Sequence, residues 1–326
     1  MQPERSPDAD EPQAYSPGEE APATRGRRVI WLYARLRLAA RGRRRFRARL
    51  AAACARGAGV AKGDMPLADA ELDAAAALLL AAHRALRPRP RLPAACTPTN
   101  LPDAYTIQDR FVARLGRPVG YKIGYTNVAL QQSLGIGEPV FGRLIEGRVW
   151  PSPATLPAAQ FATRVVETEF GFRMARALPA RAAPHGLDAV SGAVGAVLPS
   201  FEIVDSRFEE WRKLSPFEAI ADNVLHSHWV HGPEVAAFPA LDLASIDVVT
   251  RVNGVERTRG CGANVLGSPL QALHWLANGL AQMGRGLAAG DLVTTGCCTD
   301  ILELAPGDSA TAEFGPLGRV TVDFPA

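Results

Sequence analysis

The chain has 326 residues, 47 % of them hydrophobic, which suits a globular protein with a sizeable core and excludes a disordered one. Its five cysteines show no regular spacing, and two of them, Cys297 and Cys298, are adjacent. This argues against a disulfide framework and predicts a reducing, cytoplasmic location. No run of eighteen apolar residues occurs, so we expect no membrane span.

The net charge of +3 is distributed unevenly along the chain. Residues 25–62 contain twelve arginines, one lysine and no acidic residue, whereas the chain from Met65 onward has 22 basic against 26 acidic residues, a net charge of −4. We therefore expect a basic N-terminal extension, residues 1–64, that is disordered or helical, and a catalytic domain at residues 65–326. The acidic balance of that domain argues against nucleic acid as its partner.

The basic extension is open to three interpretations. It is a basic amphipathic helix that contacts membranes or nucleic acid, a targeting peptide, or a segment without function that precedes a start at Met65. Six acidic residues among the first twenty argue against the targeting peptide, because transit peptides are poor in acids.

Two helices are predicted first along the main domain. Residues 65–86 are rich in alanine and leucine, and apolar positions spaced by four indicate a helix over 103–116. Strand-like runs then dominate the chain, at 118–125, 147–150, 164–174, 196–205, 246–260, 291–296, 308–315 and 318–324. Within the fifth run, Asn253-Gly254 is typical of a type I′ hairpin.

Two more helices interrupt the strands, at 215–225 and 268–284, and both begin with Ser-Pro. In the first of them Ser215, Pro216 and Glu218 form a capping box with proline at the first helical position. Strands outnumber helices and do not alternate with them, which predicts an α+β fold with a mixed β-sheet.

Two glutamates interrupt an apolar strand pattern. Glu167 and Glu169 are two residues apart in "RVVETEFGF", so their side chains lie on one face, opposite Val166 and Phe170. A third, Glu202, lies in the apolar run "LPSFEIVD". Burial of such carboxylates costs several kcal/mol unless a partner compensates, and a divalent cation between them would do so. Oxygen ligands without His or Cys favour Mg²⁺ or Mn²⁺ over zinc, while a solvated strand face is the competing interpretation.

Several longer segments carry a family resemblance. In order they are "GYKIGYTN", "LQQSLGIGEPVFGRL", "VVETEFGFRMARALP", "LPSFEIVDSRFEEW", "IADN" and "ANVLGSPLQALHWLANGLAQMGRGLAAGDLVTTG". From about Leu67 to Phe324 the chain closely resembles the 2-keto-4-pentenoate hydratase / 4-oxalocrotonate decarboxylase family of the fumarylacetoacetate hydrolase superfamily. The resemblance implies a mixed β-sheet roll of the fumarylacetoacetate hydrolase C-terminal-domain type with flanking helices. It also implies Mg²⁺ or Mn²⁺ held by Glu167, Glu169 and Glu202, a 2-oxo or 2-hydroxydienoic acid as the small-molecule substrate, and a homo-oligomer.

The resemblance also implies roles for further residues. Lys122 in "GYKIG" matches the family's active-site lysine, against the alternative of a surface lysine. Thr295 and Thr299 in "TTGCCTD" match a segment that lines the pocket and would hydrogen-bond the substrate, against the alternative of an ordinary strand end.

The chain departs from the family pattern at two places. Val140 stands in "PVFG" where hydratases of the family commonly have an aspartate that assists proton transfer. After "IADN" the chain has "VLHSHWVHG" in place of small hydroxyl residues, and we expect His226 to act as an acid or base there, unless this segment is only a strand.

We therefore predict a metal-dependent lyase that hydrates a 2-hydroxy-2,4-dienoate to a 4-hydroxy-2-oxo acid. The alternatives are a 2-oxo-3-hexenedioate (4-oxalocrotonate) decarboxylase, an acylpyruvate-type carbon–carbon hydrolase, and a non-enzymatic, degenerate subunit that binds a partner enzyme. The hydrolase would need a His/Glu dyad near the N-terminus, and His83 has no glutamate close to it in sequence.

Overall fold

Two β-sheets carry the fold within residues 66–127, 131–132 and 135–326, the part of the chain that the computed structural model describes. The larger sheet has the order β2-β1-β10-β5-β6-β7-β3, with β11 paired to β5. Its strands are β1 (Pro118–Gly124), β2 (Val140–Ile145), β3 (Val149–Pro151), β5 (Val165–Met174), β6 (Val194–Val204), β7 (His226–His231), β10 (Leu292–Cys297) and β11 (Leu302–Glu303). Because β1 pairs with β10 in parallel and with β2 antiparallel, the sheet is mixed, as predicted.

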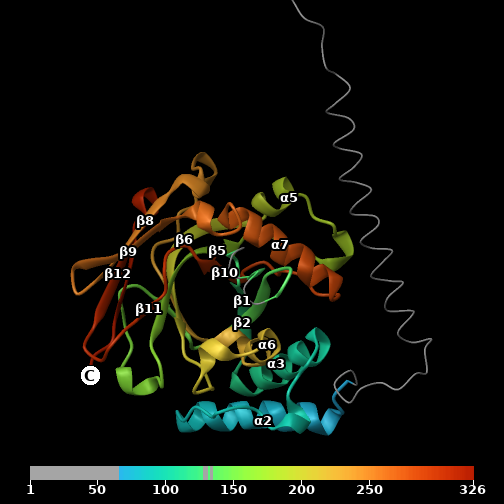
Figure 1. Ribbon diagram of the computed structural model, residues 1–326. Coiled ribbons are helices and arrows are strands. Elements are labelled where there is room, and N and C mark those ends of the chain that lie inside the picture. The colour runs from blue at the N-terminus through green and yellow to red at the C-terminus, as the bar shows by residue number, and fades with distance from the viewer. Residues whose placement is uncertain (1–65, 128–130, 133–134) are drawn as a thin grey trace, which may run out of the picture. The chain divides into compact units, whose positions relative to one another are not determined.

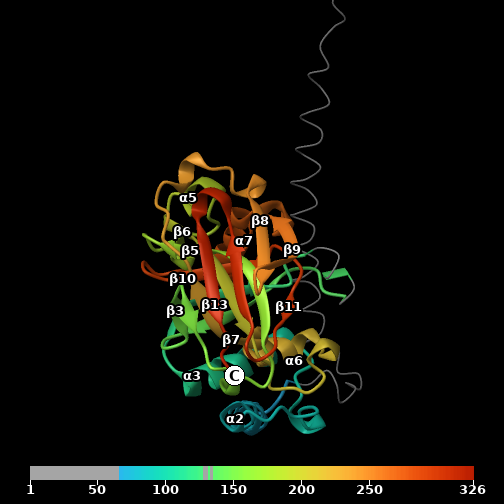
Figure 2. The same cartoon turned by 90° about the vertical axis from the view of Figure 1, so that its left-hand side faces the viewer.

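The smaller sheet lies on one side of the larger one and has the order β4-β13-β12-β8-β9. Figure 2 looks towards this sheet, with β8, β9 and β13 nearest the viewer. Its strands are β4 (Ala154–Thr155), β8 (Asp247–Val252), β9 (Val255–Cys261), β12 (Ser309–Glu313) and β13 (Arg319–Asp323). The rings of Phe170 and Phe314 pack edge to face in the core between the sheets, with 5.1 Å between their centroids. This packing buries the apolar face of β5 and leaves its glutamate face to the other side.

The helices form two groups (Figure 1). Helices α2 (Asp69–Ala85), α3 (Leu101–Leu115) and α6 (Pro216–Ala221) pack around a separate apolar cluster that includes Leu79, Phe111 and Ala221. Helix α7 (Pro269–Gln282) contacts β10 and the short helix α5 (Leu187–Ser191), which the sequence did not indicate. The helices predicted over 65–86, 103–116 and 268–284 are confirmed to within a few residues at their ends. Helix α3 begins after Asn100, whose side chain accepts the Asp103 N–H at 2.9 Å.

The predicted helix over 215–225 is wrong at its C-terminal end. Its capping box is confirmed, but α6 ends at Ala221 and a left-handed turn follows, with φ of 54°, 51° and 63° at Asn223, Val224 and Leu225. A tertiary contact holds the turn: the Asn223 side chain accepts from the Arg143 N–H at 2.7 Å and donates to the Arg143 carbonyl at 2.9 Å. This anchors the turn to β2, and the helix cannot continue through it.

The predicted hairpin is confirmed. Strands β8 and β9 meet at Asn253-Gly254, where φ is +52° and +80°, as a type I′ turn requires. In the described part of the chain no helix has the length and apolar character needed to cross a membrane. The expectations for residues 1–64 fall on residues that the structure does not describe.

Candidate metal centre

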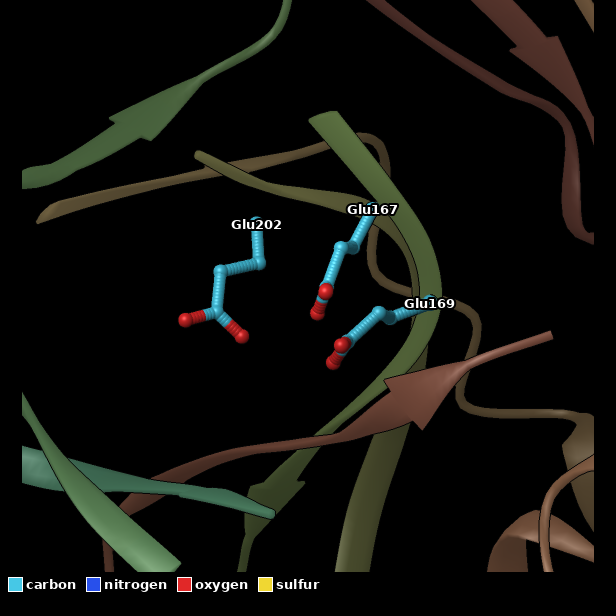
Figure 3. Close-up of side chains that lie close together, drawn as sticks. All are labelled: Glu167, Glu169 and Glu202. Carbon is cyan, nitrogen blue, oxygen red and sulfur yellow. The ribbon is translucent and has the colours of Figure 1, made fainter. Parts of the chain in front are cut away.

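Three glutamates from two neighbouring strands meet in one place. Glu167 and Glu169 lie on one face of β5, and Glu167 is the direct cross-strand partner of Glu202 on β6. Ligand oxygens, one from each side chain, lie within 4.8 Å of one another. Figure 3 shows the three carboxylates directed into a shared space. The alternation read from the sequence therefore places two of these carboxylates, and the register of β5 on β6 adds the third.

Glu169 and Glu202 are fully buried, and in each of them one carboxylate oxygen accepts hydrogen bonds while the other oxygen has no partner among the described residues. Glu169 Oε2 accepts from the Thr294 hydroxyl and, at 2.9 Å, from the Gly296 N–H, while Glu169 Oε1 has no hydrogen-bond partner among the described residues. Glu202 Oε1 lies 3.0 Å from both Lys122 Nζ and His226 Nδ1, while Glu202 Oε2 is likewise without a partner. Unpaired buried carboxylate oxygens are costly, so the donor set fits a hard divalent cation that would bind these free oxygens.

The charges of the site agree with this fit. Burial raises the pKa of all three glutamates, most strongly that of Glu169, and the neighbouring carboxylates Glu202 and Glu167 raise it further. The Lys122 cation opposes this rise at each of them. Three ionised carboxylates and one ammonium group carry a net charge of −2, which a divalent cation balances. The residues present thus suit Mg²⁺ or Mn²⁺ in charge as well as in donor type.

Lys122 is a buried cation and not a surface lysine. It lies on β1, is 2 % exposed, and donates to the Val224 carbonyl at 3.1 Å in addition to its contact with Glu202. Burial by itself lowers the pKa of Lys122, but the carboxylates of Glu202, Glu167 and Glu169 raise it above its usual value. The ammonium group therefore stays charged.

A bulge brings His226 to the glutamates. The pairing of β6 with β7 shifts between Ile203 and Val204, so that His226 is the partner of Val204 and shares the face of Glu202. Burial lowers the pKa of His226 well below its usual value, and the cations of Lys122 and two arginines add to this. A neutral His226 next to an ionised carboxylate donates from Nδ1, which leaves its Nε2 without a partner among the described residues.

The other two histidines of the segment lie elsewhere. His228 contacts Ser227 Oγ at 3.0 Å and the ring of Phe161, and its pKa is lowered to about 3 by burial and by Arg148. His231 lies 2.9 Å from the Gly232 carbonyl. Of the three histidines, His226 alone touches a glutamate of the triad.

The threonines of strand β10 lie differently from what we expected. The Thr295 hydroxyl donates to the Phe170 carbonyl at 2.9 Å, and Thr295 is not among the cavity-lining residues, whereas Thr299 is. Thr294, which the sequence analysis missed, is the residue that contacts Glu169. Thr294 pairs with Gly171, on the face of β5 that carries Glu169, so regular alternation turns Thr295 to the opposite face. Alternation alone could not tell which of the two threonines faces the glutamates. The pairing of β10 with β5 then shifts between Thr294 and Cys297. At the shift, Gly296 has a φ of +100°, and a Cβ there would lie 2.1 Å from Thr126 Oγ1, so only glycine fits.

A cavity of about 570 Å³ opens beside the triad. Lys122, Glu167 and Cys297 line its closed end, and side chains from the loops after β6 and β10 line its mouth. Val140 is 4 % exposed and pairs with Gly124, which lines the cavity, but Val140 is not itself among the lining residues. The residue that stands where hydratases of the family commonly have an aspartate is therefore buried next to the cavity.

The comparisons with known proteins agree with this geometry. The model of the fumarylacetoacetate (FAA) hydrolase C-terminal family matches residues 149–324. The 2-keto-4-pentenoate hydratase of Paraburkholderia xenovorans is 34 % identical over 69 % of this chain and 84 % of the relative, and a 4-oxalocrotonate decarboxylase of Pseudomonas putida is 32 % identical over 68 % and 84 %. The solved 4-oxalocrotonate decarboxylase of Pseudomonas putida G7, complexed with magnesium and adipate, superposes with a TM-score of 0.73 at 28 % identity, over 80 % of this chain and all of that one. The chain belongs to the fumarylacetoacetate hydrolase family, among the relatives named 2-keto-4-pentenoate hydratase and 4-oxalocrotonate decarboxylase.

Proposed function

We propose that this protein is a metal-dependent lyase that adds water to a 2-hydroxy-2,4-dienoate and forms a 4-hydroxy-2-oxo acid. The observation that carries the proposal is the pair of unpartnered carboxylate oxygens, on Glu169 and Glu202, in a buried triad next to a charged lysine. The relatives named 2-keto-4-pentenoate hydratase, 31–34 % identical to this chain, support it.

Glu167, Glu169 and Glu202 would hold the metal ion, for which Mg²⁺ is the first candidate, since a related decarboxylase was solved with magnesium. When bound, a divalent cation polarises the 2-oxygen of a 2-oxo acid and stabilises the negative charge that develops there. The hydroxyl of Thr294 and the N–H of Gly296 orient Glu169 for this task. Such partners of a ligand fix its direction and its basicity.

Lys122 has the second role at the closed end of the cavity. It is charged, it lines the cavity, and it is held between Glu202 and the Val224 carbonyl. We propose that its ammonium group binds the acid function of the substrate and adds positive charge where the enolate forms. Thr299, which also lines the cavity, would donate a hydrogen bond to the substrate by exchanging its present acceptor, the Asp300 carbonyl at 3.0 Å. Thr295 would only support β5 through its bond to the Phe170 carbonyl.

His226 acts through Glu202. Its Nδ1 contacts Glu202 Oε1 at 3.0 Å, it is 2 % exposed, and it is not among the residues that line the cavity. We therefore assign it as a positioning residue that aims the free oxygen of Glu202, in place of the proton carrier that the sequence suggested. The proton of the 2-hydroxyl is lost and carbon 5 gains a proton as the dienol becomes the 2-oxo acid, and water then adds its hydroxyl to carbon 4 and a proton to carbon 3. Val140, which pairs with the lining residue Gly124, supplies no acid for these proton transfers.

Decarboxylation of a 2-oxo-3-hexenedioate is the second candidate. It uses the same metal and the same charge on the 2-oxygen, and the related 4-oxalocrotonate decarboxylases favour it. Carbon–carbon hydrolysis has less support: His83 Nε2 lies 2.6 Å from Arg148 Nη2, and no contact with a glutamate is seen for it in the described residues.

One experiment tests the proposal. The purified full chain is incubated with Mg²⁺ and 2-hydroxypenta-2,4-dienoate or 2-oxo-3-hexenedioate, while the ultraviolet absorbance of the dienol and the release of CO₂ are followed. Loss of the dienol without CO₂ supports the hydratase, and CO₂ from the diacid supports the decarboxylase. Absence of both reactions with Mg²⁺, and again when Mn²⁺ replaces it, would refute the proposal.

Three broader expectations stay proposals of the same kind. The free thiols of Cys96, Cys261, Cys297 and Cys298 support a cytoplasmic location. Exposed apolar side chains such as Leu187 and Val255 support a homo-oligomer, which light scattering after size exclusion would test. Residues 65–326 are proposed to be the catalytic domain, because all the site residues named above lie within them.

A further inference from the structure

The mouth of the cavity differs in chemistry from its closed end. Lys122 at the closed end is 2 % exposed, whereas Ile301 at the mouth is 40 % exposed. The cavity therefore runs from the buried lysine to the solvent-exposed isoleucine. Between them the wall is mainly apolar, with Val204, Trp211, Leu214, Val224, Leu225 and Ile301, and Tyr125, Thr126 and Asn127 also line the cavity. A chain that starts at the triad must pass along these side chains to reach solvent.

The left-handed turn after α6 builds one side of this wall. Val224 and Leu225 have positive φ, which a branched side chain rarely adopts, and the Asn223 side chain holds the turn against β2. The same turn presents the Val224 carbonyl to Lys122. One strained segment thus links the cation at the closed end to the apolar wall.

The charges at the mouth leave no unpaired cation among the described lining residues. Arg212 Nη2 lies 3.0 Å from Glu303, and the Arg212 guanidinium stacks over the Trp211 ring at 4.1 Å. Asp300 also lines the mouth, with its side chain exposed. The described lining residues of the mouth thus include one arginine, already paired with Glu303, and one acid, Asp300, a balance that disfavours a second carboxylate on the substrate.

The cavity volume is larger than a five-carbon acid requires. A cavity of about 570 Å³ lies in the range that holds ligands much larger than a five-carbon acid. An apolar ligand that covers the apolar wall of such a cavity removes that surface from water, which makes the binding free energy more favourable.

From this we infer that the protein selects 2-hydroxydienoates whose far end carries an extended apolar tail, and rejects those that end in a second carboxylate. The inference rests on the proposed function, because the head of the substrate is placed at the triad. Within that function it names the substrate class and favours hydration of monoacids over decarboxylation of diacids.

Unreactive saturated 2-oxo acids test the tail alone. Calorimetry with the full chain and Mg²⁺ would compare 2-oxopentanoate, 2-oxooctanoate and 2-oxooctanedioate, which share one head and differ in tail length or terminal charge. We expect 2-oxooctanoate to bind at least about tenfold more tightly than 2-oxopentanoate, since each buried methylene favours binding severalfold. The diacid should bind at least about tenfold more weakly than 2-oxooctanoate.

Three variants sharpen the test. Trp211→Ala should reduce the preference for the long tail at least about fivefold and leave the affinity for 2-oxopentanoate unchanged. Trp150→Ala is the matched control, because Trp150 is an exposed tryptophan on β3 that does not line the cavity. Glu303→Gln removes the partner of Arg212 and should improve binding of the diacid alone.

The possible failures are distinguishable. If no 2-oxo acid binds in a Mg²⁺-dependent manner, the proposed function fails and the inference falls with it. If all three bind and the diacid is the tightest, or if the long tail brings no gain, the proposed function survives and the apolar-tail inference is overturned. Equal effects of Trp211→Ala and Trp150→Ala would also overturn it.

Discussion

Lys122 Nζ lies 3.0 Å from Glu202 Oε1, and both side chains are almost completely buried. The pair is unusual because Glu202 also belongs to a triad whose charge exceeds that of the lysine. Glu202 Oε1 contacts Lys122 and His226, whereas Glu202 Oε2 has no hydrogen-bond partner among the described residues. Glu202 Oε2 is the oxygen that a metal ion would bind, so the ion pair orients a ligand in addition to neutralising it.

The first prediction concerns the metal. Glu169→Gln keeps an acceptor for the Thr294 hydroxyl and the Gly296 N–H but removes a negative ligand. We expect Mg²⁺ affinity to fall at least about tenfold and turnover to be lost. The melting temperature of the metal-free variant should match or exceed that of the wild type, because burial disfavours the ionised glutamate. Calorimetry and thermal melts measure both, with exposed Glu313→Gln as the control; unchanged Mg²⁺ affinity would remove Glu169 from the ligand set.

The second prediction concerns the buried ion pair. Lys122→Met removes the cation and leaves Glu202 without it, which should lower the stability of the metal-free protein by about 3 kcal/mol. We expect kcat/KM to fall at least tenfold, about 1.4 kcal/mol of transition-state stabilisation. Lys213→Met, at an exposed lysine, is the control. Wild-type kinetics in Lys122→Met would mean that the lysine has no role in the reaction.

The third prediction separates two roles for His226. If it positions Glu202, His226→Ala should weaken Mg²⁺ binding about 10- to 100-fold, and His226→Asn should restore part of this, because its amide N–H can donate in place of Nδ1. His228→Ala, at a histidine that does not touch the triad, is the control. A loss of kcat by about 10²- to 10⁴-fold at unchanged Mg²⁺ affinity in both variants would instead identify His226 as the proton carrier.

The fourth prediction concerns Val140, the apolar residue at the expected position of an acid. Val140→Asp should raise kcat for 2-hydroxypenta-2,4-dienoate, because a placed acid–base group is worth about 10²- to 10⁴-fold. It should also lower the melting temperature, since position 140 is 4 % exposed and a carboxylate there must be desolvated. Val140→Asn controls for shape and polarity. An equal or lower kcat in Val140→Asp than in Val140→Asn would show that this chain uses another acid.

The fifth prediction concerns pH and a second buried ion pair. Burial raises the pKa of Asp222 from 3.8 to about 6, although Arg207 opposes this. The folded protein therefore holds this proton at a pH where the unfolded chain has lost it. Stability from Asp222 is fully present below about pH 4 and is lost as the pH rises through 6, on the order of 3 kcal/mol.

Thermal melts between pH 4 and 7 measure this effect. The melting temperature of the wild type relative to Asp222→Asn should fall as the pH rises across this range. Asp247→Asn, at an exposed aspartate, should run parallel to the wild type. A difference between wild type and Asp222→Asn that does not change with pH would contradict the shifted pKa.

The sequence by itself determined the local features of this protein. Strict alternation places Glu167 and Glu169 on one face of a strand, because side chains two apart in an extended chain point the same way. The capping box at Ser215 and the Asn253-Gly254 turn are likewise properties of a few neighbouring residues. Glu202 stood out as a charge within an apolar run, and the family resemblance assigned it to the same site as Glu167 and Glu169.

Only the tertiary structure decided which residues meet across strands. The bulge in β7 reverses the face on which His226 would otherwise lie, and the bulge in β10 brings Cys297 opposite Glu169. A bulge arises from pairing with a neighbour that local sequence does not reveal. The turn at 223–225 ends α6 against its own helical tendency, because hydrogen bonds to β2 hold the backbone in a conformation that no local preference favours. Contacts between distant segments therefore set the donors of the metal centre and the wall of the cavity, whereas neighbouring residues set only the strands and helices that carry them.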